Sequence, residues 1–240
     1  MPETNALGQP IGFRVDAWTP PPPPPLDPMT GRTCRVEPLN AARHAADIHA
    51  ANLLDTDGRS WTYLPYGPFD TVEGHTAWVT SVTASADPQF HAIVDLSTGR
   101  AAGLASYLRI DPPAGAIEVC HIHYSPLLQR SVAATEAMYL MMKRAFELGY
   151  RRYEWKCDAL NAPSRAAAQR LGFSYEGVFR QARLTKGRNR DTAWYAAIDS
   201  EWPALDAAFR RWLDPSNFDE EGRQRTSLSI WTGPILIARG

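Results

Sequence analysis

Cysteine is scarce in this sequence, and the three cysteines present, Cys34, Cys120 and Cys157, follow no paired spacing. An odd and unpatterned set argues against a disulfide framework and favours a reducing cytoplasm. An excess of charge of one sign is missing too, because the formal net charge is −1. No global field therefore favours nucleic acid or an anionic membrane, and we expect neither as a partner.

Long apolar runs are also absent. No stretch approaches the roughly 20 apolar residues that a membrane-spanning helix needs. The first ten residues have neither the basic segment nor the apolar core of a signal peptide. What is present is a chain of 240 residues with an ordinary globular composition, long enough to bury a full core. We expect a cytoplasmic protein with one main domain and appendages.

Residues 1–32 are predicted to be an N-terminal proline-rich arm rather than core. Pro20 to Pro25 is an unbroken proline run, which must adopt a polyproline II conformation. Such a run could be a ligand for an aromatic groove, but its flanks lack the basic residues that these motifs often carry. We expect an extended arm that lies on its own domain or on a partner subunit, so a homodimer stays open.

Residues 33–200 alternate between strand and helix patterns and are predicted to form the main domain. The expected strands are 33–37, 89–95, 102–110, 117–124, 152–158, 173–183 and 192–199, and the expected helices are 41–54, 71–85, 135–148 and 164–171. Asn40 and Asp70 are the expected caps of the first two helices. The strand–helix–strand order from 117 to 158 implies a parallel pair. The fold class is therefore α+β, with a mixed and largely antiparallel sheet flanked by helices.

Residues 201–240 are predicted to be a C-terminal accessory extension. Leu205, Phe209 and Trp212 have the spacing of one buried helix face. The apolar stretch 228–238 would then form an accessory strand or arm. Elsewhere, the aromatic loop 61–69 is broken by proline and glycine. It would either wall a substrate pocket or seal an edge of the core.

The loop at residues 129–134 leads directly into the long helix. A loop of small residues that feeds a helix start directs backbone N–H groups and the positive end of the helix dipole at one spot. The sequence therefore predicts an anion site here, suited to a diphosphate.

Four motifs in this chain resemble those of GNAT-superfamily N-acetyltransferases, in the branch of the ribosomal-protein N-terminal acetyltransferases. Residues 129–136, QRSVAATE, stand where the family has Q-G-x-G-x-A-T-E, and residues 148–152, LGYRR, match L-G-x-x-R. Asn161 and Ser164 with residues 171–173 match N-x-x-S…L-G-F, and residues 176–182 match E-G-x-x-x-Q-A. The resemblance covers roughly residues 33–200. It implies the GNAT fold, in which two parallel strands splay apart in the middle of the sheet.

The same resemblance implies an acetyl-CoA-dependent N-acetyltransferase. An acetyl group would pass directly to a primary amine of a small molecule or of a peptide or protein N-terminus, with no acyl-enzyme and no metal. Ser164 stands at the position proposed to protonate the departing thiolate, or else it caps the short helix. The residues implied to bind acetyl-CoA are Ile122 and Tyr124 through their main chain, Asn161 and Ser164 beside the pantetheine, and Gln129, Arg130, Ser131, Val132, Ala133, Ala134 and Thr135 in the loop.

Glycine is missing where this family usually has it, because Arg130 and Val132 replace the two loop glycines. Glycine allows close approach of the backbone to phosphate and unusual backbone angles, which these residues are expected to deny. Arg130 could instead contact phosphate through its guanidinium. The alternative function is therefore a non-catalytic acyl-CoA-binding or regulatory module.

The motifs do not assign the general base, because this chain has Arg183 where relatives often carry a carboxylate. Glu118 is the first candidate and Asp158 the second, and each could instead be an ion-pair partner. Arg183, with two further basic residues nearby, would suit an acceptor that carries a carboxylate or phosphate, or would be a solvated hairpin charge.

A Cys-His-Ile-His stretch at residues 120–123 raises the question of a metal site. Strand alternation would place His121 and His123 on one face and Cys120 on the other, and no second cluster of ligands accompanies them. We therefore expect no metal. His121 and His123 would line the acceptor side or be core residues, and Cys157 would be a buried thiol near the thioester.

Overall fold

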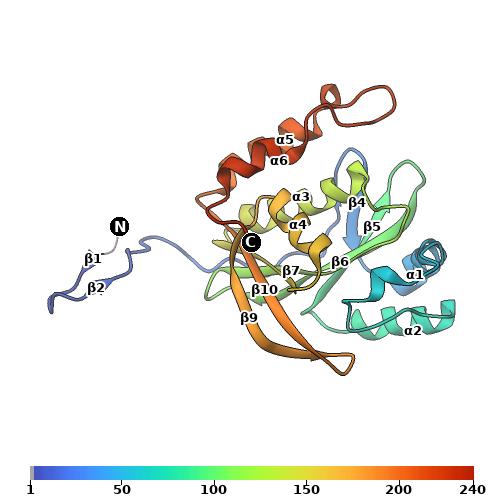
Figure 1. Ribbon diagram of the computed structural model, residues 1–240, viewed down its shortest axis with the longest axis horizontal. Coiled ribbons are helices and arrows are strands. Elements are labelled where there is room, and N and C mark those ends of the chain that lie inside the picture. Colours follow the sequence, from blue (N-terminus) through green and yellow to red (C-terminus); the bar gives the residue numbers. More distant parts are fainter. Residues whose placement is uncertain (1–2) are drawn as a thin grey trace.

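A computed structural model describes residues 3–240, and an eight-stranded mixed sheet forms its centre (Figure 1). The spatial order of its strands is β3 (Met29–Thr30), β4 (Cys34–Pro38), β5 (Gln89–Asp95), β6 (Arg100–Asp111), β7 (Ala116–Tyr124), β8 (Arg152–Asp158), β10 (Arg188–Ile198) and β9 (Ser174–Thr185). Only β7 and β8 pair in parallel, and the other neighbours are antiparallel. The predicted α+β class and the predicted parallel pair are confirmed. A separate hairpin of β1 (Glu3–Thr4) and β2 (Pro10–Ile11) stands apart from this sheet (Figure 1).

Helices cover both faces of the sheet. The α-helices are α1 (Ala41–Asn52), α2 (Val72–Val82), α3 (Val132–Glu147), α4 (Ala162–Arg170), α5 (Trp202–Leu213) and α6 (Leu228–Thr232), and the 3-10 turns are η1 (Arg59–Trp61), η2 (Pro215–Asn217) and η3 (Gly233–Ile235). In Figure 1, α3 and α4 lie on one face, whereas α1 and α2 lie on the other, near β5 and β6. None of the helices within residues 3–240 combines the length and the apolar character that crossing a membrane requires.

Helix caps explain where the predicted boundaries hold and where they are wrong. Asn40 caps α1 as predicted, since its side chain accepts from the Arg43 amide. The predicted Asp70 cap of α2 is wrong, because the neighbouring Thr71 accepts from the Gly74 amide at 3.1 Å. α3 starts three residues earlier than expected, because Ser131 is its N-cap. Ser131 has an extended backbone, and its side chain accepts from the Ala134 amide.

Glu136 on α3 joins that helix to the N-terminal strands. Its buried carboxylate accepts from the backbone amides of Arg32 at 2.8 Å, Thr33 at 2.6 Å and Cys34 at 3.3 Å. A side chain at Gly31 would collide with this carboxylate. Glu136 therefore fixes the turn between β3 and β4 against the helix.

The proline run lies on its own domain, one of the two arrangements that the sequence left open. The Pro24 carbonyl accepts from Gln89 Nε2 at 2.9 Å, and the Pro22 carbonyl accepts from the Tyr150 hydroxyl at 3.2 Å. Arg144 donates to the Asp27 carbonyl at 2.7 Å. Met29, inside the segment predicted as an arm, is buried and starts β3, so the sheet begins before residue 33. Residues 1 and 2 of the predicted arm lie outside the described residues.

The C-terminal segment is helical where a strand or arm was expected. The predicted helix with Leu205, Phe209 and Trp212 is confirmed as α5, and all three side chains are buried. The expectation of a strand in 228–238 is wrong. Leu228 and Thr232 are four residues apart and buried, which places them on one helical face, so the segment folds as α6 and η3.

Candidate active site

A cleft opens in the middle of the sheet because β7 and β8 pair along only part of their length. Their parallel register runs from Ala116 opposite Arg152 to Val119 opposite Trp155. Beyond that point the two strands line opposite walls of a cleft. β7 contributes Cys120, His121 and Ile122, and β8 contributes Lys156, Cys157 and Asp158. The splayed parallel strands implied by the resemblance are therefore present.

A β-bulge in β7 accompanies this separation. Ser106 of β6 lies opposite Cys120 and Leu104 lies opposite His123, so two residues of β7 face one residue of β6. His121 has a left-handed φ of 51°. A bulge bends its strand and resets the alternation of side chains. The prediction that Cys120 and His121 face opposite sides is therefore wrong, since both line the cleft.

The aromatic loop at residues 61–69 forms one wall of the cleft and also seals the core. Tyr63 lines the cleft and donates its hydroxyl to the Leu160 carbonyl at 3.2 Å, which links the loop to the end of β8. Tyr66 stacks on His121 with 5.6 Å between ring centroids. Trp61 is buried and lies over His123 at 3.8 Å. The two roles that the sequence left open are thus divided among different residues of the loop.

His121 and His123 are both neutral at neutral pH. Burial, together with the nearby guanidinium groups of Arg109, Arg183 and Arg190, lowers the pKa of His121 to about 4. Burial also lowers the pKa of His123 to about 4. His123 Nε2 lies 3.0 Å from the Ser60 hydroxyl, so this ring is anchored beneath the loop. Of the two, His121 is the one that lines the cleft.

The hairpin of β9 and β10 forms a further wall of the cleft, beside the wall formed by the aromatic loop. Arg183 and Arg190 are directly opposite each other in the register and both line the cleft. Lys186, at the turn, donates to the carbonyls of Trp61 at 2.9 Å and Gly67 at 3.3 Å, so it ties the hairpin to the aromatic loop. Arg190 was missed from the sequence because the last strand was expected to begin at residue 192. β10 in fact begins at Arg188 and β9 runs to Thr185, so only two residues connect them and Arg183 pairs with Arg190.

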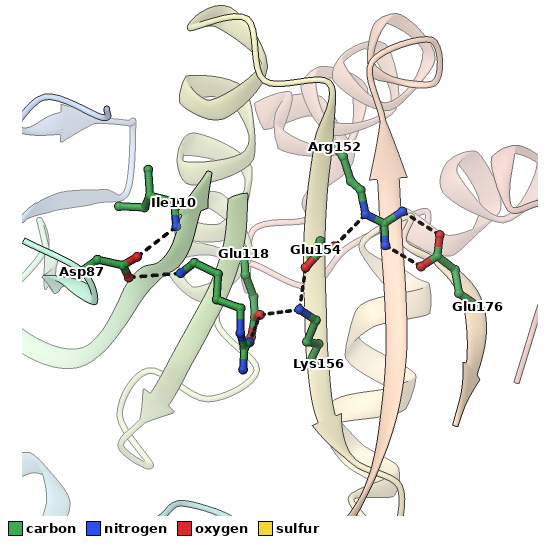
Figure 2. Close-up of polar contacts among 8 residues, drawn as sticks. Asp87, Ile110, Glu118, Arg152, Glu154, Lys156 and Glu176 are labelled. Carbon is green, nitrogen blue, oxygen red and sulfur yellow. Dashed lines mark hydrogen bonds and ion pairs between the residues drawn. The ribbon is translucent and has the colours of Figure 1, made fainter. Parts of the chain in front are cut away.

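The two candidate bases differ in how they are paired. Glu118 is buried and pairs with Lys156 Nζ at 2.9 Å and with Arg109. Lys156 also pairs with Glu154, and Figure 2 shows this chain continuing through Arg152 to Glu176 on β9. Glu118 is thus the ion-pair partner that the sequence named as its alternative role.

Asp158 is less committed than Glu118. Its carboxylate accepts from the Leu160 amide at 2.9 Å, and within residues 3–240 no Lys, Arg or His nitrogen lies close enough to form an ion pair with it. It lines the cleft at the end of β8. Of the two predicted bases, Asp158 has the carboxylate that a substrate can reach.

Ser164 does not cap α4, because Asn161 does so by accepting from the Ser164 amide at 3.2 Å. The Ser164 hydroxyl instead accepts from Trp155 Nε1 at 3.0 Å, which leaves its own proton available in the cleft. Asn161 also lines the cleft, and its side-chain nitrogen has no partner within residues 3–240.

The cleft thiols are held in the protonated form. Burial raises the pKa of Cys157, and burial together with Glu118 raises the pKa of Cys120 to about 12. A thiolate nucleophile at neutral pH is therefore disfavoured. Among the described residues, no group of three or more His, Cys, Asp or Glu side chains could hold a metal ion.

The loop before α3 corrects the expectation about its missing glycines. Arg130 has a φ of 59°, so it adopts the left-handed conformation that was expected only of glycine at this position. This costs about 1–2 kcal/mol for a residue with a Cβ. Val132 is simply the first helical residue of α3. The loop therefore keeps a path that glycine usually provides.

The backbone donors of this loop are partly used within the chain. Ser131 donates its amide to the Leu128 carbonyl at 3.3 Å, and the Ala134 amide binds the Ser131 hydroxyl at 3.0 Å. The amides of Val132 and Ala133 have no acceptor in the part of the chain that the structure describes. Two free amides at a helix start remain a fitting cradle for a phosphate group.

The side chains of three residues predicted to bind the cofactor form hydrogen bonds within the chain instead, and these bonds hold the loop before α3 in place. Gln129 Nε2 donates to the Tyr124 carbonyl at 2.8 Å. The Tyr124 hydroxyl donates to the Ala134 carbonyl at 3.1 Å, and the Thr135 hydroxyl accepts from Arg170 at 3.2 Å. These side chains hold the loop against the end of β7 and against α4.

Comparisons with known proteins agree with this geometry. The family model described as the acetyltransferase (GNAT) domain matches residues 35–174. The chain is similar to the crystal structure of a GCN5-related N-acetyltransferase from Brucella melitensis, with 44% identity, a TM-score of 0.89, and coverage of 91% of this chain and 100% of that one. It is also similar to a GNAT-family acetyltransferase from Chromobacterium violaceum, with 38% identity, a TM-score of 0.76, and coverage of 82% and 98%.

A more distant likeness concerns the fold alone. An acetyltransferase from Salmonella typhimurium, described as modifying the N-terminal serine of a 50S ribosomal subunit protein, shares 20% identity at a TM-score of 0.61, with coverage of 72% of this chain and 99% of that one. No protein with a curated description matches the sequence. On the extent of the family match and the identity to the Brucella structure, the chain belongs to the GNAT family of acetyltransferases.

Proposed function

We propose that this acetyltransferase passes the acetyl group of acetyl-CoA directly to the primary amine of a small molecule or of a peptide N-terminus. The observation that carries the proposal is the cleft between β7 and β8, which opens after Val119 and Trp155. β7 leads from this cleft into the loop before α3, where a phosphate can bind, and the Tyr124 carbonyl at its end accepts from Gln129 of that loop. The cleft itself is enclosed by the aromatic loop and the β9–β10 hairpin, where an amine can enter.

The donor side would use the loop before α3. The free amides of Val132 and Ala133 and the dipole of a helix of 16 residues favour the diphosphate of CoA. Arg130 is exposed beside them and can add a charged contact. Asn161 and the main chain at Ile122, both in the cleft lining, would hold the pantetheine. Ile122 belongs to the bulge, whose backbone is not fully used by β6.

The transfer itself needs one proton removed and one supplied. The amine lone pair attacks the thioester carbonyl, a C–N bond forms, and the C–S bond breaks as the CoA thiolate leaves. We assign Asp158 as the group that takes the amine proton, directly or through water, because its carboxylate lines the cleft without a cationic partner. Ser164 is assigned as the donor to the thiolate, since its hydroxyl keeps a free proton.

The experiment is steady-state release of CoA thiol from acetyl-CoA in the presence of an amine library, with mass spectrometry of the products. Acetylated amine formed in proportion to free CoA supports the proposal. The test includes peptides with free N-termini, because the Salmonella relative is described as acting on one. Tight binding of acetyl-CoA without turnover on any amine would instead support a non-catalytic acyl-CoA-binding module.

A further inference from the structure

Two arginines on the wall of the cleft that the β9–β10 hairpin forms lack the carboxylate partners that surface arginines usually have. Arg183 and Arg190 form a cross-strand pair of like charges, an arrangement that disfavours the hairpin unless something neutralises it. Within residues 3–240, no carboxylate lies within ion-pairing distance of either guanidinium. Most other arginines near the sheet are paired, as Arg152 is with Glu154 and Glu176.

Both arginines belong to the lining of the cleft. Residues directly opposite in a register project from the same face of a sheet, so Arg183 and Arg190 share one face. Thr192 also lines the cleft, although a β-bulge separates it from Arg190 in the register. Asp191, within this bulge, accepts from the Gln181 amide at 2.7 Å and forms an ion pair with neither arginine in residues 3–240.

Unused donors accompany this charge. Arg190 Nε is buried and has no hydrogen-bond partner within the described chain, and the same is true of the Thr192 hydroxyl, which is 5% exposed. Leaving a buried donor unpaired costs roughly 1–3 kcal/mol, and more for a charged group. An anionic ligand group in the cleft would neutralise the two guanidinium charges that line it.

We infer that the acceptor amine carries an anionic oxygen group, a carboxylate or a phosphate, which Arg183 and Arg190 bind while the amine lies near Asp158. This inference rests on the proposed function and names the class of its substrate. Asp158 lies opposite Thr192 in the register, and Arg190 is two residues further along β10. Two residues span about 7 Å of strand, so Arg190 and Asp158 belong to the same part of the cleft wall. A small acceptor that carries both an amine and an anionic group can therefore contact both residues.

The test uses matched pairs of amines that differ only in the anionic group. The pairs are O-phosphoethanolamine and ethanolamine, β-alanine and β-alaninamide, and two peptides that differ by glutamate or glutamine at the second position. We expect kcat/KM for the anionic member to exceed that for its neutral match by about ten- to hundredfold, the scale of a charged hydrogen bond. Whichever pair shows the preference distinguishes phosphate from carboxylate and a small acceptor from a peptide.

The variants Arg183→Gln and Arg190→Gln should reduce that preference to within about twofold while the KM for acetyl-CoA stays unchanged. Arg188→Gln is the matched control, since it removes the same charge from the same hairpin at a residue that is exposed and outside the cleft lining. It should keep the full preference. Equal or faster turnover of the neutral members by the unaltered chain would overturn the inference and leave acetyl transfer standing.

A binding measurement keeps the two failures apart. If no amine is acetylated, the proposed function fails, but the anion site can still be tested by calorimetry with O-phosphoethanolamine and β-alanine in the presence of CoA. Binding that is lost in Arg183→Gln and kept in Arg188→Gln supports the site. Absence of binding to the unaltered chain overturns it.

Discussion

Burial and pairing give chemically similar side chains different roles at the scale of single residues. Glu118 and Asp158 are carboxylates on adjacent strands, but Lys156 and Arg109 neutralise the first and no cation pairs with the second in residues 3–240. His121 and His123 are both held neutral, but only His121 lines the cleft. The chemistry of the site is therefore decided by what each residue touches.

Removing each carboxylate separates these two roles. Asp158→Asn should lower kcat/KM by about 10²–10⁴-fold, the usual contribution of a positioned base, with little change in acetyl-CoA affinity. Glu118→Gln should instead lower the free energy of unfolding, by less than the about 3–5 kcal/mol of an unpaired buried charge, because Glu154 still holds Lys156. Steady-state kinetics and urea unfolding measure the two effects. The assignment fails if Asp158→Asn retains full activity.

Arg130 allows the backbone and the side-chain contributions of the loop before α3 to be tested separately. Arg130→Ala should weaken CoA binding by about 1–3 kcal/mol if the guanidinium binds phosphate. Arg130→Gly should weaken binding equally, yet be more stable than the alanine variant by about 1 kcal/mol, because glycine accepts the left-handed φ of 59° without strain. Calorimetric titration with CoA and urea unfolding provide the readouts. Unchanged CoA affinity in both variants would mean that the side chain points elsewhere.

How far sequence could predict the site depends on whether a residue acts through its own motif or through the register. Asn161 and Ser164 were found from their motif, and both line the cleft. Arg190 and Thr192 have no motif, and they reach the cleft only because a short turn sets the pairing of β9 and β10. The bulge at His121 was missed as well, because the strand was read with unbroken alternation, whereas a bulge inserts one extra residue and shifts that alternation.

At the scale of elements, capping and periodicity decided most boundaries. Every strand expected in the main domain is present within a few residues, because each is an apolar or alternating run bounded by turn residues. The two-residue strand β3 was not predicted, since two residues show no period. Segment 228–238 was misjudged because a short apolar run fits a strand and a helix equally well.

The join between α3 and the first strands can be tested at Glu136. Glu136→Gln should lower the free energy of unfolding by about 3 kcal/mol, since the carboxylate accepts from three backbone amides in a buried setting. Glu147→Gln, at the other end of α3, removes only an exposed pair with Lys143 and should cost about 0.5 kcal/mol or less. Urea unfolding compares the two. Equal losses would contradict the anchoring role of Glu136.

At the scale of the whole molecule, burial of histidine links stability to pH. Five of the six histidines have a pKa lowered by burial, and for His91, His121 and His123 the value is about 4. The unfolded chain protonates these groups near 6.5, whereas the folded chain does not. Between about pH 6.5 and pH 4 the unfolded state therefore binds more protons, so the free energy of unfolding falls as pH falls.

We expect urea unfolding, followed by tryptophan fluorescence, to give a lower midpoint at pH 5.5 than at pH 7.5. His91 is fully buried and neither ring nitrogen has a partner in the described chain. His91→Phe keeps an aromatic ring and removes one titrating group, so it should make this pH dependence shallower. The same midpoint at both pH values in the unaltered chain would contradict this expectation, because it would mean that the folded chain binds as many protons at pH 5.5 as the unfolded chain does.

The proline arm has a consequence for the order in which the molecule is assembled. Its carbonyls at Pro22, Pro24 and Asp27 bind Tyr150, Gln89 and Arg144, all of which follow the arm in the chain by 65 residues or more. A growing polypeptide makes the arm before it makes any of these partners. The arm stays extended because of its own prolines, and its full set of contacts can form only after α3 and Tyr150 have been synthesised. Complete docking of the arm therefore follows the synthesis of the first 150 residues.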